Sequence, residues 1–97
     1  MGNYKLSNDA EEELIEIYYY SVLEFGINQA RRYTTGLHQT FNTLTDNPKM
    51  GRVCKPIKEE YRRYEHKSHV IFYVIIDDDI LILHVLGESQ DPTKHLI

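Results

Sequence analysis

Six cationic or imidazole side chains in the second half of the chain have the chemistry needed to handle a phosphate group. They are Lys55, Lys58, Arg62, Arg63, His69 and His84. Lysine and arginine can hold phosphodiester oxygens and stabilise a pentavalent transition state, and histidine can act as a general acid or base. However, no three of these residues stand out as a base, its orienting partner and an oxyanion donor. His84 lies in an apolar run, where a packed or hydrogen-bonded histidine is the expected role. We therefore predict no catalytic residue.

Other reactive residue types have structural explanations. Asp9 and Glu11 to Glu13 crowd the first turn of a predicted helix, where the helix dipole favours negative charge. Cys54 is the only cysteine, so we expect a packing residue in a reducing cytoplasm. His66 and His69 straddle a turn with no third ligand nearby. We predict neither a metal site nor a cofactor.

Charge is distributed unevenly along the chain, whose formal net charge is −4. Residues 47–67 carry seven basic and three acidic side chains, while the segments on either side each have a net charge of −4. This basic belt could meet an acidic partner or a phosphate backbone. The alternative is a solvated face that pairs with the acidic helix surface. No apolar run approaches the roughly eighteen residues that a membrane span needs, and the N-terminus lacks a signal-peptide core.

The first half of the chain predicts a short extended piece at Tyr4–Leu6 and then two helices. The first helix begins at Ser7 or Asn8 and ends at Gly26; with Asn8 as N-cap, Glu11 completes a capping box. Its core face has apolar spacings of three and four: Ala10, Leu14, Ile17, Tyr18, Ser21 and Phe25. Because Tyr18, Tyr19 and Tyr20 fan around the helix about 100° apart, at least one should lie on the surface or on a second contact face.

The second helix is predicted from about Asn28 to Thr45. Its core face is Ala30, Tyr33, Leu37, Phe41 and Leu44, and Pro48 prevents its continuation. A connection of about two residues requires the helices to pack as an antiparallel hairpin. Lys49 to Glu60 is predicted to be a loop.

The second half predicts a strand at Tyr61–His66 and a β-hairpin at 69–86, turning at Asp77–Asp79. The expected fold is a single α+β domain in the order β-α-α-β-β-β. Three consecutive strands form an antiparallel meander, the first strand lies at an edge, and the helical hairpin covers one face of the sheet. A short tail from Asp91 is expected to form a turn of helix.

The predicted strands of the hairpin are apolar on both faces, and the helices cover only one of them. The far face of residues 69–86 is therefore a candidate protein-binding surface. The alternative is that the tail and the loop around Ile57 fold over it.

Several stretches, taken in their order and spacing, resemble the ParE toxins of bacterial type II toxin–antitoxin modules, within the RelE/ParE superfamily. They are YKLSNDAEEELIEIYYYSVLEFG at the start, QARRY in the second helix, the NPKMGR loop, YRRYEHKSHVIFY and VLGESQDPTKHL. The resemblance covers nearly the full length. It implies two antiparallel helices on a small, mainly antiparallel sheet, as the residue pattern also predicts.

The resemblance also implies function and partners. Similar proteins inhibit DNA gyrase by protein–protein contact. A ParD-like antitoxin holds them inactive in a hetero-oligomer, with a ribbon-helix-helix domain that binds DNA and a disordered tail that wraps around the toxin. A protein of this kind contacts DNA only through the antitoxin and does not bind membranes.

The belt, the far face of the β-hairpin and the resemblance together suggest two sets of site residues. The expected antitoxin-binding residues are Tyr61, Arg62, Arg63, Tyr64, His69, Phe72 and Tyr73. The expected target-interaction residues are Arg52, Lys55, Lys58, His84, Gln90 and Asp91.

The end of the last strand departs from the family pattern, in which an Arg-Ile-Leu-His run is often followed by Met-Asp. His84 stands in place of the arginine, Gly87 of the histidine and Gln90 of the methionine, whereas Asp91 is retained. These departures leave open the alternative of a non-toxic homologue that only binds the antitoxin. The other branch of the superfamily gives a second alternative, a ribosome-dependent mRNA endoribonuclease of the RelE type.

Overall fold

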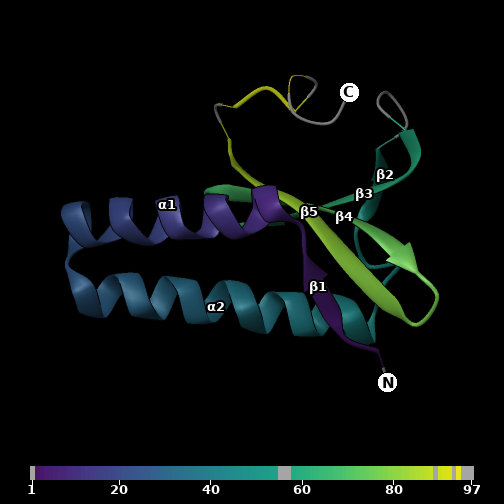
Figure 1. The fold of residues 1–97 in the computed structure, drawn as a ribbon, viewed down its shortest axis with the longest axis horizontal. Helices are drawn as coiled ribbons and strands as arrows, with labels where there is room; N and C mark the ends of the chain where they lie inside the picture. Colours follow the sequence, from purple (N-terminus) through teal and green to yellow (C-terminus); the bar gives the residue numbers. More distant parts are fainter. Residues whose placement is uncertain (1, 55–57, 89, 93, 95–97) are drawn as a thin grey trace.

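A layer of two helices packs against a five-stranded sheet (Figure 1). The computed structural model describes residues 2–54, 58–88, 90–92 and 94, with Glu59 described by its backbone only. The elements in chain order are β1 (Tyr4–Leu6), α1 (Asn8–Phe25), α2 (Ile27–Asp46), β2 (Arg52–Cys54), β3 (Lys58–His66), β4 (His69–Ile76) and β5 (Asp79–Gly87). The predicted α+β class, helical hairpin and β-hairpin are confirmed. The turn of helix predicted after Asp91 lies largely outside the described residues.

The first helix is capped by Ser7. The Ser7 Oγ accepts a hydrogen bond from the Ala10 N–H at 3.0 Å and donates one to the Leu83 carbonyl at 2.7 Å. Because Ser7 is the N-cap, Ala10 occupies the third helical position, and the capping box predicted for Asn8 and Glu11 is wrong. The cap thus also fixes the start of α1 to β5.

The sheet has the strand order β1-β5-β4-β3-β2. Strands β3, β4 and β5 form the predicted antiparallel meander. Strand β1 lies at one edge and pairs in parallel with β5, Tyr4 opposite Ile80 and Leu6 opposite Ile82. The predicted edge position of this strand is therefore confirmed.

Strand β2 forms the other edge, and its residues were predicted to be a loop. It pairs with β3, which itself begins at Lys58 rather than at Tyr61. The segment before β2 is fixed by Tyr73, whose hydroxyl donates to the Pro48 carbonyl at 2.7 Å and accepts from the Gly51 N–H at 2.9 Å. A strand of three residues is too short to show a repeating pattern in the sequence, and the tyrosine that holds it lies far along the chain.

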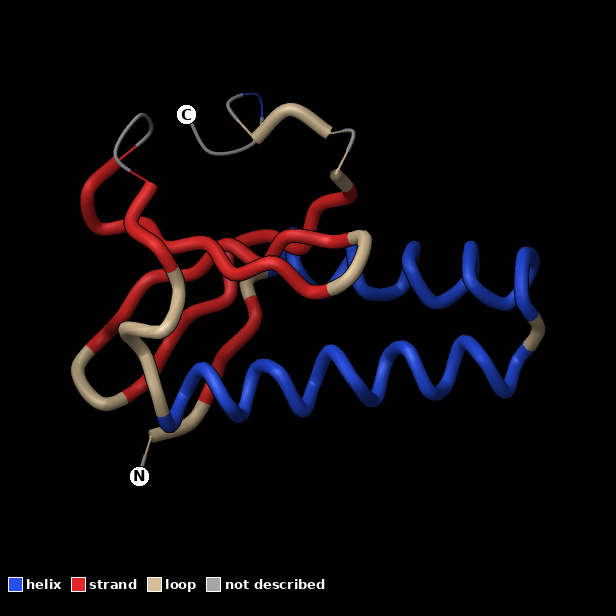
Figure 2. Tube along the Cα trace, turned by 180° about the vertical axis from the view of Figure 1, so that it is seen from behind, coloured by secondary structure: helices blue, strands red, loops and turns tan. Residues whose placement is uncertain are grey.

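The main core lies between the helices and the sheet. Helical residues Leu37 and Phe41 and strand residues Ile71 and Tyr73 are fully buried there. Figure 2 shows the same two layers from behind.

A second, smaller cluster on the far face of the sheet contains Cys54, Val70, Phe72 and Leu86, all buried. The centre of this face, with Phe72 only 1% exposed, is therefore closed, and the prediction that it is an open binding surface is wrong. The Arg63 guanidinium carbon lies 5.6 Å from the centre of the Phe72 ring, so β3 contributes to this cover. Ile57 lies outside the described residues.

The helical hairpin is longer than the sheet that it covers. Figures 1 and 2, which view the molecule from opposite sides, both show the α1–α2 turn projecting beyond the strands. At this turn Gly26 has a φ of +88°, a conformation that glycine adopts without strain. Neither helix within the described residues combines the length and apolar character that crossing a bilayer requires.

Candidate partner-binding surface

Large exposed hydrophobic side chains gather on the projecting helical hairpin. Ten such side chains are exposed among the described residues, and six of them lie between positions 15 and 27. These six, which we call the hairpin patch, are Ile15, Tyr19, Tyr20, Leu23, Phe25 and Ile27. Exposed apolar side chains concentrated in one region of a small protein mark a surface that binds another molecule.

Part of the hairpin patch is exposed because the sheet does not extend beneath the whole hairpin. The buried residues of α1 are Ala10, Leu14 and Ser21. Phe25, near the turn, is 67% exposed, so its predicted place on the core face is wrong. Tyr19 and Tyr20 are both exposed, which confirms that at least one of the three consecutive tyrosines faces outward.

A groove runs beside the hairpin patch, between the helices and the β3–β4 turn. One hollow of about 290 Å³ is lined by residues of α1, α2 and that turn, including Tyr20, Phe25, Tyr33 and His69. A second hollow of about 180 Å³ shares Tyr20 and His69 with the first and continues to Gln90. The groove thus places two predicted site residues, His69 and Gln90, beside the hairpin patch.

Tyr33 and two histidines form the wall of this groove. The Tyr33 hydroxyl lies 2.5 Å from His69 Nδ1, and the Thr40 hydroxyl lies 3.0 Å from His66 Nδ1. Burial lowers the pKa of both imidazoles, assisted by Lys67 at His66 and by His66 at His69. Both rings are therefore neutral near pH 7 and serve as hydrogen-bonding groups rather than cations.

His84, a predicted target-interaction residue, is hydrogen-bonded to Glu13 of α1. Its Nδ1 lies 2.8 Å from Glu13 Oε2, and Glu13 Oε1 accepts from the Val85 N–H, also at 2.8 Å. A β-bulge precedes this contact, since Phe72 pairs with His84 and Tyr73 with Ile82. The bulge gives β5 one extra residue and so permits His84 to meet α1.

Arg52, Lys58 and Arg62 of the basic belt make separate contacts rather than forming one site. Arg62 Nη1 donates to the Gly51 carbonyl at 2.7 Å, and Arg52 pairs with Glu65 at 2.6 Å. The Lys58 ammonium lies 5.5 Å from the centre of the Tyr61 ring. Lys55 lies outside the described residues.

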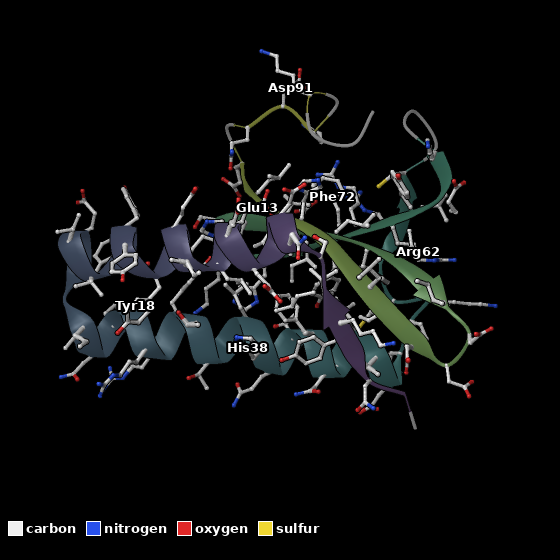
Figure 3. The ribbon with its side chains drawn as sticks, in the orientation of Figure 1. Glu13, Tyr18, His38, Arg62, Phe72 and Asp91 are labelled. Carbon is white, nitrogen blue, oxygen red and sulfur yellow. The ribbon has the colours of Figure 1, made fainter. Side chains whose placement is uncertain are left out.

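The predicted antitoxin-binding residues fall into different environments. Phe72 and Tyr73 are buried, and a buried side chain cannot form a contact surface in the folded state, so the structure places these two in the core. Tyr61 and Tyr64 are half-buried on β3. In Figure 3, Arg62 on the sheet and Tyr18 on the projecting hairpin lie at opposite ends of the molecule.

The C-terminal target-interaction residues lie just beyond β5. Gln90 Oε1 accepts from the Gly87 N–H at 2.7 Å, which closes the turn after the strand. Asp91 follows and is exposed. Gln90 lines the groove, whereas Arg52 is on the edge strand β2 and Lys58 is on the adjacent strand β3.

Sequence reasoning missed the hairpin patch, although one signal was available. Ile15, Tyr19 and Leu23 repeat every four residues outside the core-facing set of α1. A helix whose apolar residues exceed one face has a second contact surface.

The fold matches a solved structure described as "Chromosomal ParDE TA system from P. aeruginosa". The TM-score is 0.75 with 18% identity, covering 90% of this chain and 96% of that one. A family model described as "ParE toxin of type II toxin-antitoxin system, parDE" matches residues 4–92. The chain is thus a toxin of the type II toxin–antitoxin class.

Within that class, it belongs to the ParE family. Toxin ParE1 of Caulobacter vibrioides is 33% identical over 96 residues, which cover 99% of both chains. Toxin ParE1 of Mycobacterium tuberculosis is 30% identical over 96 residues, covering 98% of both. The resemblance seen in the sequence is therefore confirmed.

Proposed function

We propose that this chain is a cytoplasmic ParE toxin that inhibits DNA gyrase by protein–protein contact and that a ParD-like antitoxin neutralises it. The observation that carries the proposal is the hairpin patch, with six large exposed hydrophobic side chains between residues 15 and 27. A protein that acts by contact needs such a surface, and a partner must cover it while the toxin is held inactive.

The described cations support contact rather than chemistry as the mode of action. Arg62 is bonded to a loop carbonyl, Arg52 to Glu65, and His84 to Glu13. A phosphodiester-cleaving site needs several such groups converging on one phosphate. In this proposal the toxin uses no cofactor and performs no reaction of its own.

The antitoxin in this proposal is a ribbon-helix-helix protein whose tail folds on binding, and the complex is a hetero-oligomer. A disordered tail can follow a surface that is not confined to one face. The hairpin patch and the neighbouring groove are such a surface, because they extend from the outside of α1 to the β3–β4 turn. DNA binding belongs to the antitoxin and not to this chain.

Two measurements test the proposal. Induced alone in bacteria, the chain should arrest growth and cause filamentation. The proposal further expects a gene for a ribbon-helix-helix protein beside that of this chain, and co-expression of its product should restore growth. The purified chain should also alter gyrase supercoiling or DNA cleavage. Unchanged gyrase activity with mRNA cut on the ribosome would support the endoribonuclease alternative, and an absence of growth arrest would support the non-toxic homologue.

A further inference from the structure

Two arginines lie side by side on the far face of the sheet, which is turned away from the helical hairpin. Arg52 of β2 pairs with Arg63 of β3, and Arg63 pairs with Phe72 of β4, a member of the second buried cluster on that face. Residues paired across neighbouring strands point to the same face of a sheet, and like charges at such positions destabilise it. An anion placed beside the two arginines would offset their repulsion.

Only one of the two arginines has an anionic partner within the part of the chain that the structure describes. Arg52 Nη2 donates to Glu65 Oε1 at 2.6 Å, and the two side chains are 72% and 60% exposed. Arg63 forms no ion pair with any described residue. Its Nε is buried and its guanidinium carbon lies 5.6 Å from the centre of the Phe72 ring, so this packing orients the cation before any ligand binds.

The two arginines line one hollow at the surface of β2 and β3. Its volume is about 370 Å³, and the other lining residues are Met50, Tyr64 and Glu65. The charges of both arginines also act on the Cys54 thiol, where they oppose the rise in pKa that burial causes. The two guanidinium groups are thus near enough to each other for one anion in the hollow to interact with both.

We infer that Arg52 and Arg63 bind a carboxylate group of the toxin's protein target. A guanidinium can donate two parallel hydrogen bonds to one carboxylate, which gives both attraction and orientation. An exposed ion pair contributes little to stability, so Arg52 can exchange Glu65 for the carboxylate of a partner at small cost. This inference rests on the proposed function, since it names the chemistry by which the toxin contacts its target.

Neighbouring cations do not extend this hollow into a track for a nucleic-acid backbone. Arg62 donates to the Gly51 carbonyl, and the Lys58 ammonium lies over the Tyr61 ring. Binding a nucleic acid requires several cations along successive phosphates. The two arginines of the hollow together with the Glu65 carboxylate give a net charge of only +1. The hollow is therefore suited to a single carboxylate of a protein.

Opposite charges at the two ends of the molecule favour different partners. Figure 3 shows Arg62 of β3 and Tyr18 of α1 at opposite ends. Helix α1 contains six acidic residues and no lysine or arginine, so a partner of the hairpin patch gains from positive charge, whereas a partner of the hollow gains from negative charge. A second copy of the chain would bring a net charge of −4 to a molecule that already carries −4. We therefore assign the hollow to the target rather than to the antitoxin or a second copy.

Gyrase inhibition and antitoxin affinity, measured on the same purified variants, test the inference. Arg63→Gln keeps most of the side-chain size but removes the charge. It should raise the toxin concentration that half-inhibits DNA supercoiling about tenfold and leave the Kd for the ribbon-helix-helix antitoxin within about twofold. The matched control is Lys5→Gln, which removes an exposed cation from β1 at the other edge of the sheet and should change neither quantity.

Glu65→Gln distinguishes a binding site from a structural ion pair. It removes the carboxylate that competes for Arg52 and so should lower the half-inhibitory concentration about threefold at low salt, and by less at high salt because salt screens the charges. If the Arg52–Glu65 pair only supports the fold, the same variant should inhibit less well than the wild type. Urea unfolding midpoints verify that each variant is folded. Should Arg63→Gln fail to fold, Arg52→Gln, which changes an exposed side chain, should raise the half-inhibitory concentration about threefold.

Several results would overturn the inference. Arg63→Gln could inhibit gyrase as Lys5→Gln does, it could weaken antitoxin binding as much as gyrase inhibition, or the wild-type toxin could sediment as a dimer that Arg63→Gln disrupts. Gyrase inhibition by the wild type that the variants at positions 52, 63 and 65 leave unchanged contradicts only this inference. A wild-type chain that neither inhibits gyrase nor binds the antitoxin contradicts the proposed function as well.

Discussion

Glu13 and His84, 71 residues apart in the chain, connect the first helix to the last strand. One oxygen of the Glu13 carboxylate lies 2.8 Å from His84 Nδ1, and the other accepts the Val85 N–H at the same distance. Strand β1 pairs with β5 only as far as Ile82, so beyond this point a side chain of α1 bonds the edge of β5 in place of a strand. One carboxylate, labelled in Figure 3, therefore adds two hydrogen bonds to the contacts that hold the helical hairpin against the end of the sheet.

Replacing Glu13 by glutamine should destabilise the fold. A glutamine amide can accept from Val85 through its one oxygen but cannot supply a charged acceptor to His84. Hydrogen bonds to charged groups contribute about 1.5–3 kcal/mol, so we expect a loss of roughly 1–2 kcal/mol in the free energy of unfolding. Urea unfolding measures this loss of stability. Glu16→Gln, an exposed carboxylate on the same helix, is the control, and an equal effect of the two variants would contradict the assigned role.

Tyr73→Phe should loosen β2 from the sheet. The substitution keeps the buried ring but removes the hydroxyl that bonds Pro48 and Gly51, which leaves the Gly51 N–H without its acceptor. Burying one unpaired backbone group costs about 1–3 kcal/mol. We expect a loss of this size in stability and faster amide exchange at residues 51–54. The exposed Tyr19→Phe serves as control; retained protection of β2 in Tyr73→Phe would show that the hydroxyl does not hold it.

The parts of the fold that sequence predicted are those with repeating patterns. Helix spacing located α1 and α2, and continuous apolar runs located β4 and β5, because each of these signals is local. Strand β2 was missed because it depends on Tyr73, a residue 22 positions from Gly51. The position of Phe25 was misjudged for a related reason: helical spacing places it near the core face, but only the extent of the sheet decides whether anything covers it.

The candidate site was less predictable than the fold. The basic belt was predicted to be an interface because its charges are close together in the sequence. In the structure, Arg52 and Arg62 make separate contacts within the chain. The presence of an acidic residue at position 13 was attributed to the helix dipole. That explanation does not predict the hydrogen bonds that Glu13 makes to β5. Side-chain partners far apart in the chain cannot be read from spacing, whereas the family resemblance, which spans the whole chain, was confirmed.

Stability should fall as the pH drops through about 6.5. Burial lowers the folded-state pKa of His66 and His69 below their ordinary value of 6.5, with Glu88 opposing the shift at His69. Between the folded and unfolded pKa values the unfolded chain binds more protons, so stability rises with pH there and is lost on acidification. The double variant His66→Gln, His69→Gln should flatten the change in urea midpoint between pH 7.5 and 5.5. An unchanged slope would exclude these two imidazoles as its source, and Ser68→Ala should keep the wild-type slope.

Arg62 should affect stability more than its neighbour Lys49 does. The Arg62 guanidinium donates to the Gly51 carbonyl at 2.7 Å and more weakly to the Lys49 carbonyl at 3.4 Å, whereas the Lys49 residue is exposed. We expect Arg62→Ala to lower the free energy of unfolding by about 1–2 kcal/mol and Lys49→Ala to change it by less than about 0.5 kcal/mol. Urea unfolding distinguishes the two, and equal values would show that the loop does not depend on Arg62.

Arg63 tests whether the basic belt is an interface. Its Nε is a buried donor with no acceptor among the described residues, and its guanidinium covers Phe72 while lining a hollow with Arg52. A partner carboxylate in this hollow would pair with the charged guanidinium, so Arg63→Ala should weaken growth arrest or antitoxin binding more than Lys49→Ala does. Arg63→Ala also uncovers Phe72, so a second variant is needed to separate the two effects. Arg63→Lys serves this purpose because it keeps the charge and much of the apolar stem. Full toxicity and unchanged antitoxin affinity in both Arg63 variants would mean that this arginine only covers the second core.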